Sequence, residues 1–362
     1  MMGKILYIII QLSAERSLTM ETPLVSVIMS VYNGEAYLKA AVFSILNQTY
    51  QNFEFIIIDD CSTDNSFSIL KNFNDKRIHL IRNEKNLKLP SSLNIGLKAS
   101  KGKYIIRMDA DDISLPRRIE KQVKFMEAHS DIAIAFSDVL RFSGKKIQID
   151  FNTNDLSFKG IQSILLFYNV INHTAVIINK NLIPDLTYPT KYSIAEDMAL
   201  WILLLKNHKV SYMRENLVLY RIHEKQVSSA MTDLQRQQVV DIKTPILNEL
   251  TGGNENTNYE LHTLISLKTE KLSVQDLMSW MYFLEKSNSK NKVYPPGIFR
   301  ENLVRMIFIV GMNNKYPKRI LIKALFRFGS LPLTFFIIKA FYNGLLDIFY
   351  LIPGIIKGRK LL

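Results

Sequence analysis

The regular pattern of the chain begins with two apolar, β-branched runs, Leu24–Val31 and Phe53–Asp60. Between them, Glu35–Asn47 repeats its apolar positions with the period of a helix. Strand, helix and strand in this order make a βαβ unit, and strands that are apolar on both faces predict a parallel sheet covered by helices on both sides. Ligands bind such sheets beyond the carboxyl ends of the strands, so we expect the functional residues there.

The same pattern continues to about residue 235 and then becomes helical, with a capping-box signal at Ser273–Asp276. The sequence thus predicts an α/β fold, with a Rossmann-like, mainly parallel sheet flanked by helices over residues 21–235 and a helical region over residues 236–362. Within the first part, further helices are predicted at Ser66–Phe73, Ser91–Ala99, Pro116–His129 and Glu196–Asn207, and further strands at His79–Arg82, Lys103–Met108, Ile132–Ser137, Ala175–Ile178 and Leu217–Ile222.

The positive charge of the chain is concentrated in its last part. Of a formal net charge of +13, the segment Lys286–Leu362 carries +12, from 14 lysines and arginines against two acids. Phenylalanines, leucines and isoleucines lie between these cations, a composition typical of a surface that binds anionic lipid rather than nucleic acid. The sequence therefore predicts that residues 236–362 are membrane-proximal, and it predicts no nucleic-acid partner.

The most apolar stretch of the tail, Leu331–Ile356, is interrupted by Pro332, Lys339, Asp347 and Pro353. A spanning helix needs about 20 predominantly apolar residues, so we expect helices that lie in the membrane interface and a peripheral protein. An ordinary helical packing domain or a homodimer surface is the alternative.

Two further features bear on the compartment. A single cysteine, Cys61, excludes an intrachain disulfide and favours a reducing compartment. The apolar run Ile5–Ile10 is too short for a membrane span and is not followed by a convincing signal-peptide cleavage site. Residues 1–20 are therefore interpreted as a short leader, with translation from Met20 as an open alternative. We expect the protein on the cytoplasmic side of a membrane.

The strongest local sign of chemistry is an acidic motif at the end of the predicted strand Lys103–Met108. Alternation along an extended chain turns Asp109 and Asp111 toward the same side. Two carboxylates on one face repel each other unless a cation lies between them, and a hard divalent cation that also binds phosphate oxygens suits them. The alternative is an acidic turn in which an aspartate caps the following helix.

Three loops would meet at one edge of the predicted sheet: Ser30–Gly34, Asp59–Ser66 and the loop of Asp109. With them, the stretches VSVIMSVYNGEAYLKAAVFSILNQTYQNFEFIIIDDCSTDNS and SLNIGLKASKGKYIIRMDADD resemble the family 2 glycosyltransferases of the GT-A fold. The resemblance covers about residues 24–230 and rests on several motifs in order. It implies a GT-A type of sheet and the transfer of a sugar from a nucleotide diphosphate donor.

The resemblance implies that the first two loops bind the nucleoside of the donor. Val31, Tyr32 and Asn33 would contact it, together with the acidic pair Asp59 and Asp60, in which one carboxylate accepts the base N–H. A UDP-sugar is therefore the expected donor. The alternative for the acidic pair is a turn that ends a strand.

Asp109 and Asp111 resemble the aspartate-any-aspartate motif of the family. This implies that Asp111 binds Mn²⁺ or Mg²⁺ and that Asp109 contacts the ribose or metal-bound water, while Asp112 resembles a third acid with a less fixed role. A segment that ends at His223 resembles one that closes over the diphosphate. It implies a donor contact for Arg221 and makes His223 a candidate metal ligand, although a lone histidine is more often structural.

Arg82 and Arg107 are candidates to neutralise the donor diphosphate, although an arginine beside acids is just as often part of a structural ion pair. The chain also departs from the family pattern at one position. Many relatives carry a glycine two residues after the equivalent of Asn86, where this chain has Lys88. We expect Lys88 to reshape the loop beneath the donor.

Glu196 and Asp197 open a predicted helix, as does the Glu-Asp motif that this family uses for its catalytic base. The resemblance implies that Asp197 is the base and that Glu196 belongs to the same catalytic pair. Direct displacement at the anomeric carbon needs a base that takes the proton of the acceptor hydroxyl, and it inverts the configuration. The alternative is that both acids only favour the helix N-terminus through its dipole.

The principal interpretation is an inverting hexosyl- or N-acetylhexosaminyltransferase that acts on a glycan or lipid-linked acceptor in cell-surface polysaccharide biosynthesis. The alternative is a catalytically inactive sugar-nucleotide-binding or scaffold protein at the membrane, which a loss of the metal or base acids would favour; all of them are present. Nucleotidyl transfer and dinucleotide oxidoreduction are disfavoured, because neither a glycine-rich basic phosphate loop nor a G-x-G-x-x-G motif follows the first strand.

Overall fold

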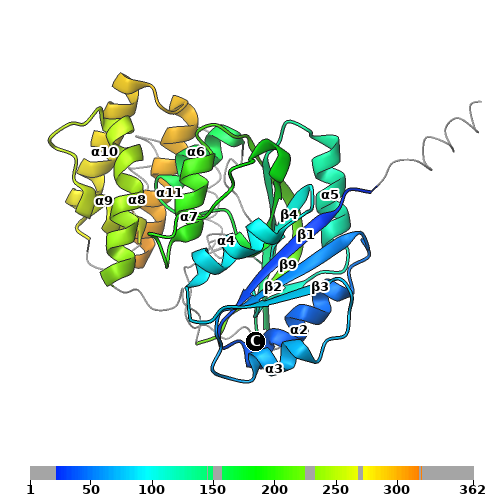
Figure 1. Cartoon of the computed structure of the whole chain (residues 1–362). Helices are drawn as coiled ribbons and strands as arrows, with labels where there is room; N and C mark the ends of the chain where they lie inside the picture. Colours follow the sequence, from blue (N-terminus) through cyan, green and yellow to red (C-terminus); the bar gives the residue numbers. More distant parts are fainter. Residues whose placement is uncertain are drawn as a thin grey trace, which may run out of the picture.

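The structure of the protein, a computed structural model, describes residues 22–144, 146–149, 157–224, 233–267, 272–317 and 319. A nine-stranded sheet with helices on both faces forms one part, and a group of helices lies beside it (Figure 1). The predicted leader, residues 1–20, and the apolar stretch of the tail, residues 331–356, lie outside the described residues.

The sheet has the order β3-β2-β1-β4-β8-β6-β9-β5, with β7 paired to β6. Its first four members are parallel, β8 is antiparallel to both of its neighbours, and β6 and β9 are parallel to each other. The strands are β1 (Val25–Val31), β2 (Phe53–Asp59), β3 (Ile78–Arg82), β4 (Tyr104–Arg107), β5 (Ile113–Ser114), β6 (Ile134–Ser143), β7 (Lys146–Ile149), β8 (Val176–Asn179) and β9 (Val210–Arg221).

Helices cover both faces of this sheet, because its central strands are apolar on both sides. Phe55 and Ile57 pack against α2, α3 and α5, whereas the alternate residue Ile56 packs against α4, α6 and α7. The helices are α2 (Glu35–Leu46), α3 (Ser66–Lys71), α4 (Leu89–Ala99), α5 (Arg118–Ala128), α6 (Phe158–Leu165) and α7 (Glu196–Leu204). The predicted α/β class is confirmed.

Several elements differ from the sequence prediction: strand β5 was not expected, and β6 continues to Ser143, beyond the predicted Ser137. Helix α6 was not expected, because it has only eight residues and includes Gly160; its N-terminus is capped by Ser157, whose Oγ accepts the Gly160 N–H at 3.2 Å. Strand β9 begins at Val210, well before the predicted Leu217. Residues 214–216 are exposed and the pairing of β9 with β6 is irregular at Asp138, so the alternation of polar and apolar residues is interrupted there.

The helical region consists of α8 (Asp233–Thr251), α9 (Tyr259–Ser266), α10 (Val274–Asn291) and α11 (Pro296–Asn313). The predicted cap of α10 is present, since Ser273 Oγ accepts the Asp276 N–H at 3.0 Å. The domain boundary at residue 235 stays a prediction. In the part of the chain that the structure describes, no helix is both long and apolar enough to span a bilayer.

One segment belongs to the hydrophobic cores of both parts. Ile164 and Leu165, at the end of α6, pack in the core of the sheet. The next two residues, Leu166 and Phe167, are fully buried in the core of the helical region. Ile171 lies in the core of the sheet again. The chain thus enters and leaves the helical region within a few residues.

Candidate active site

The first two loops of the predicted site meet at the carboxyl end of the parallel strands. Val31 pairs with Asp59 in the register of β1 and β2, and the Asp60 N–H donates to the Val31 carbonyl at 2.8 Å. Asn33 has a positive φ of 52°, and its Oδ1 accepts the Thr63 N–H at 2.8 Å. These contacts lock the first loop to the second and leave Tyr32 50% exposed beside them.

The two acids of the second loop have different surroundings. Asp60 is held by the protein, since its Oδ1 accepts hydrogen bonds from Asn83 Nδ2 and the Leu87 N–H, both at 2.8 Å. Asp59 is fully buried, and neither of its carboxylate oxygens has a hydrogen-bond partner among the described residues. Among the described residues, Arg82 forms an ion pair with Asp59, with Nε 3.2 Å from Oδ2. A buried carboxylate without hydrogen bonds is costly, so Asp59 is suited to accept one from a ligand.

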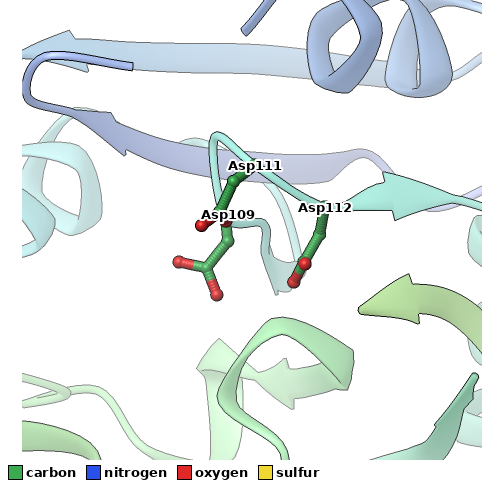
Figure 2. Close-up of side chains that lie close together, drawn as sticks. All are labelled: Asp109, Asp111 and Asp112. Atoms are coloured by element: carbon green, nitrogen blue, oxygen red, sulfur yellow. The ribbon is translucent and has the colours of Figure 1, made fainter. Parts of the chain in front are cut away.

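Three aspartates gather in the loop that follows β4 (Figure 2). One oxygen each of Asp109, Asp111 and Asp112 lies within 4.8 Å of the others, a spacing that suits a metal ion. Burial raises the pKa of Asp112 well above its ordinary value, and the charges of Asp109 and Asp111 raise it further. Three carboxylates at this distance repel each other, so the donor set fits a hard divalent cation.

The end of β9 lies against this acidic loop. The Arg221 N–H donates to Asp112 Oδ1 and Arg221 Nε donates to the Asp111 carbonyl, both at 2.8 Å. His223 is outside the group of three acids, but its Nε2 lies 2.9 Å from Asp111 Oδ2. Tyr37 of α2 contacts both side chains, with its ring 4.3 Å from the Arg221 guanidinium carbon and 4.9 Å from the His223 ring. The predicted roles of Arg221 and His223 stay predictions.

Arg107, the last residue of β4, lies between the acidic loop and a second group of acids. It is 4% exposed and forms an ion pair with Asp109. Burial lowers the pKa of Arg107, but the charge of Asp109 and, less strongly, that of Glu196 raise it by more, so the net shift is upward. Arg107 is therefore a buried cation that lies beside carboxylates. Its predicted contact with a diphosphate stays a prediction.

The second group of acids opens helix α7. Asp197 Oδ2 accepts a hydrogen bond from Asn169 Nδ2 at 2.8 Å, and burial raises the pKa of Asp197. Glu196 is 6% exposed, and burial, with the charge of Asp197, raises its pKa to about 8. His173 lies beside them, with Nδ1 3.7 Å from Glu196 Oε1 and Nε2 2.7 Å from the Tyr188 hydroxyl. Two acids with raised pKa values are typical of a site that transfers protons.

Three side chains that contact residues of the site were not found from the sequence. Tyr37 contacts Arg221 and His223, Asn169 contacts Asp197, and Tyr188 contacts His173. Each is a single polar or aromatic residue outside a motif, so no sequence signal distinguishes it from a surface or core residue.

Lys88 adopts a backbone conformation that favours glycine. Its φ is 70° and its ψ is 161°, a region that residues with a Cβ rarely adopt. Two contacts fix the turn around it: Asp60 accepts the Leu87 N–H, and Asn86 Oδ1 accepts the Lys88 N–H at 3.0 Å. These contacts hold the turn and leave the Lys88 side chain exposed; the predicted reshaping of the loop beneath the donor stays a prediction.

Comparisons with known proteins agree with this geometry. Residues 26–174 match the family model described as "Glycosyl transferase family 2". An uncharacterized glycosyltransferase of Haemophilus influenzae is 36% identical over 278 residues, which cover 74% of this chain and 82% of that protein. The UDP-Glc:alpha-D-GlcNAc-diphosphoundecaprenol beta-1,3-glucosyltransferase WfaP of Escherichia coli is 34% identical over 212 residues, which cover 57% of this chain and 80% of that protein.

The fold is shared with solved glycosyltransferase structures. S. aureus TarS, residues 1–349, crystallised with UDP-GlcNAc, superimposes with a TM-score of 0.54 over 82% of both chains, at 19% sequence identity. This likeness confirms the expected GT-A type of sheet. From the matched family, the extent of the shared sequence and the fold, the chain is a member of glycosyltransferase family 2.

Proposed function

We propose that the protein transfers a sugar, with inversion, from a UDP-sugar to a glycan or lipid-linked acceptor of cell-surface polysaccharide biosynthesis. The observation that carries this proposal is the position of Arg107. Its guanidinium pairs with Asp109 on the donor side, and its charge acts on the acids Glu196 and Asp197 at the start of α7. A donor site and a base site are therefore adjacent, as direct displacement requires.

The buried carboxylate of Asp59 supports a nucleoside donor. It lies at the end of β2 beside the loop of Tyr32 and Asn33, and it has no hydrogen-bond donor among the described residues. A base with an N–H between two carbonyls, such as uracil, supplies the missing donor. The E. coli relative named for UDP-Glc and a diphosphoundecaprenol acceptor supports the same class of donor and acceptor here.

Asp111, with Asp109 and Asp112 beside it, is the proposed holder of Mn²⁺ or Mg²⁺. When bound, such an ion neutralises the charge of the diphosphate leaving group. Arg221 and His223 fix the shape of the acidic loop through Asp111 and Asp112, so that the carboxylates keep one arrangement.

Asp197 is the proposed general base. Burial raises its pKa, which brings it closer to the value at which a carboxylate removes a hydroxyl proton efficiently. Asn169 donates to one carboxylate oxygen and the Met198 N–H donates to the other at 2.6 Å, so the group is oriented before the acceptor arrives. Attack from the side opposite the diphosphate then inverts the anomeric centre.

We further propose that the protein is peripheral to the cytoplasmic face of a membrane, through its basic, apolar tail. The charge of +12 between Lys286 and Leu362 supports this, because such segments are attracted to anionic lipid. It places the enzyme where lipid-linked acceptors are found. Homodimerisation through the same region is the alternative role for the tail.

The test is a screen of radiolabelled UDP-glucose, UDP-galactose, UDP-GlcNAc and UDP-GalNAc, each with a membrane lipid extract and either Mn²⁺ or EDTA. We expect Mn²⁺-dependent incorporation of one sugar into the lipid fraction, with inverted configuration at the new linkage. Tight binding of a UDP-sugar without transfer or hydrolysis would instead favour the inactive scaffold protein. Metal-independent transfer would contradict the role of the three aspartates.

A further inference from the structure

The residue that orients the proposed base lies between the two hydrophobic cores. Asn169 donates to Asp197, and its own Oδ1 accepts the Ile171 N–H at 3.0 Å. It lies two residues after Phe167, which with Leu166 is buried in the core of the helical region. The position of Asn169 therefore depends on how residues 166–168 are held in that region.

Two buried side chains of the helical region contact the backbone of residues 166 and 167. Lys243 of α8, which is 1% exposed, donates from Nζ to the Phe167 carbonyl. His262 of α9, which is fully buried, has its Nε2 2.8 Å from the Leu166 carbonyl. The last carbonyls of a helix have no partners within the helix, and α6 ends at Leu165. Lys243 and His262 thus fix the carbonyls that follow α6.

His262 is a donor at every working pH. Burial, with the charge of Lys243, lowers the pKa of His262 to about 3, so the imidazole is neutral. Trp280 Nε1 lies 3.2 Å from its Nδ1, and an indole nitrogen can only donate. The ring proton is therefore on Nε2, where it faces the Leu166 carbonyl. This hydrogen bond is therefore kept over the pH range of the assay.

Helix α8 also contacts the other side of the base. Gln238 is 6% exposed, and its Oε1 accepts the Ile194 N–H at 3.1 Å, three residues before Asp197. Ile242 of the same helix packs against Ala195 and Ala199 of α7. The helical region is therefore in contact both with the helix that carries the base and with the segment that carries its partner.

We infer that Lys243 and His262 are positioning residues for catalysis, which act by holding the backbone of residues 166–169 so that Asn169 orients Asp197. The inference rests on the proposed role of Asp197 as the base. It gives the helical region a part in sugar transfer that is separate from any contact with the membrane. Loss of either contact lets Asn169 move, and a displacement of about 1 Å in a catalytic group costs up to about 10²-fold in rate.

The test compares His262→Leu, His262→Gln and Lys243→Met in the full-length protein. Asn302→Leu is the matched control. Asn302 is likewise buried, at 2% exposed, but it donates to Ser163 Oγ within α6 at 2.9 Å rather than to residues 166–169. Transfer is assayed with the UDP-sugar that gives Mn²⁺-dependent incorporation into a membrane lipid extract, and kcat and the donor KM are determined separately. Thermal unfolding of every variant confirms that it is folded at the assay temperature.

We expect His262→Leu and Lys243→Met to lower kcat by about 10- to 100-fold, with the donor KM unchanged. His262→Gln keeps an N–H donor at a similar reach and should recover much of the rate, whereas Asn302→Leu should keep the wild-type kcat. Adding Lys243→Met to Asn169→Ala should cause little further loss, since both act on the same contact. Equal losses in the Asn302 control, or a fully additive double variant, would overturn the inference.

A second measurement needs no substrate. Amide hydrogen exchange of peptides that cover residues 166–172 and 194–198 should be faster in Lys243→Met than in wild type, and unchanged in Asn302→Leu. Unchanged exchange in Lys243→Met would overturn the inference even if that variant were poorly active. Asp197→Asn, assayed alongside, separates the two proposals: if it transfers normally, the proposed base is wrong, and if it alone loses transfer, only the positioning role is wrong.

Discussion

His223 and Asp111 are separated by 112 positions in the chain, and their side chains lie 2.9 Å apart between Nε2 and Oδ2. This contact joins the end of β9 to the acidic loop after β4. Arg221 joins the same two segments through the Asp111 carbonyl and the Asp112 carboxylate. The proposed metal site is therefore shaped by residues from two segments that are far apart in the sequence, one after the central strand β4 and one at the end of β9.

Asp111→Ala should abolish metal-dependent binding of the donor, because Asp109 and Asp112 alone cannot bridge a cation to two phosphates. Calorimetric titration of UDP in the presence and absence of Mn²⁺ measures the effect. Asp131→Ala is the control, since Asp131 is an exposed acid paired with Lys209 on the surface. Unchanged Mn²⁺-dependent affinity in Asp111→Ala would remove this residue from the site.

Asp197→Asn should lower transfer by about 10² to 10⁴, the usual contribution of a positioned general base. The amide keeps the size of the side chain but cannot take the proton of the acceptor hydroxyl. Donor and metal binding should be retained, because the proposed UDP site is on the other side of Arg107. Parallel measurement of transfer and of UDP affinity checks both points. Simultaneous loss of UDP binding would indicate a structural role for Asp197 instead.

The raised pKa of Glu196 predicts that stability falls as the pH rises. The pKa is about 8 in the folded protein, against an ordinary value of 4.5, so the folded state binds more protons than the unfolded state between these values. The free energy of unfolding should therefore decrease from about pH 5 to pH 9, by on the order of a few kcal/mol. Urea unfolding at pH 5, 7 and 9 measures this slope. Glu196→Gln should flatten it, and an equally steep slope in that variant would assign the effect to other groups.

Lys88→Gly should raise the free energy of unfolding by about 1 kcal/mol, because glycine adopts the conformation of this turn without strain. Lys88→Ala is the control: it removes the same charge but keeps a Cβ at φ 70°, so it should bring no such gain. Urea unfolding midpoints of the two variants are compared at one pH. If the two are equally stable, the turn is not strained. A loss of UDP affinity common to both would show that the lysine charge serves the donor.

Deletion of the residues after Gly329 should release the protein from membranes and leave hydrolysis of the donor largely intact. High salt should weaken membrane binding of the full-length protein as well, since the attraction of the basic tail to anionic lipid is screened. Fractionation and vesicle flotation measure the distribution. A truncated protein that stays in the membrane fraction, or a full-length protein that is freely soluble, would contradict the proposed role of the tail.

The sequence predicted those parts of the molecule in which local pattern and tertiary environment agree. Strands β1 and β2 are apolar on both faces because helices cover both faces, and Asp109–Asp112 follow a buried strand whose end could be recognised. The acids of the donor site could therefore be placed at one edge of the sheet before the structure was known. The resemblance of the sequence to the family identified one further candidate, Asp197. No local pattern distinguishes this residue from an ordinary acid at the start of a helix.

Other parts depend on contacts that a local pattern does not contain. Helix α6 is short, and it packs against the core of the sheet and against α7 and α11, contacts that its own sequence does not reveal. Asn169 lies just past its end and shows no motif, so its contact with Asp197 could not be predicted. The burial of Arg107 was not predicted either, because the sequence gives the charge of a side chain but not the depth at which it lies.

Because Asn169 is positioned by residues that come later in the chain, the parts of the proposed site are completed in a definite order during synthesis. When β9 has left the ribosome, all strands of the sheet and the acidic loop have been made, and α7 with Asp197 is also present. Asn169 at that stage still lacks Lys243 and His262, which are synthesised later in α8 and α9. A nascent chain, or a product ended by an early stop codon after β9, keeps the residues of the proposed donor site but lacks the contacts that position Asn169, so we expect it to bind the nucleotide sugar and to transfer it poorly. On this proposal, the positioning of Asp197 is completed last, when the helices that follow the sheet have folded around residues 166 and 167.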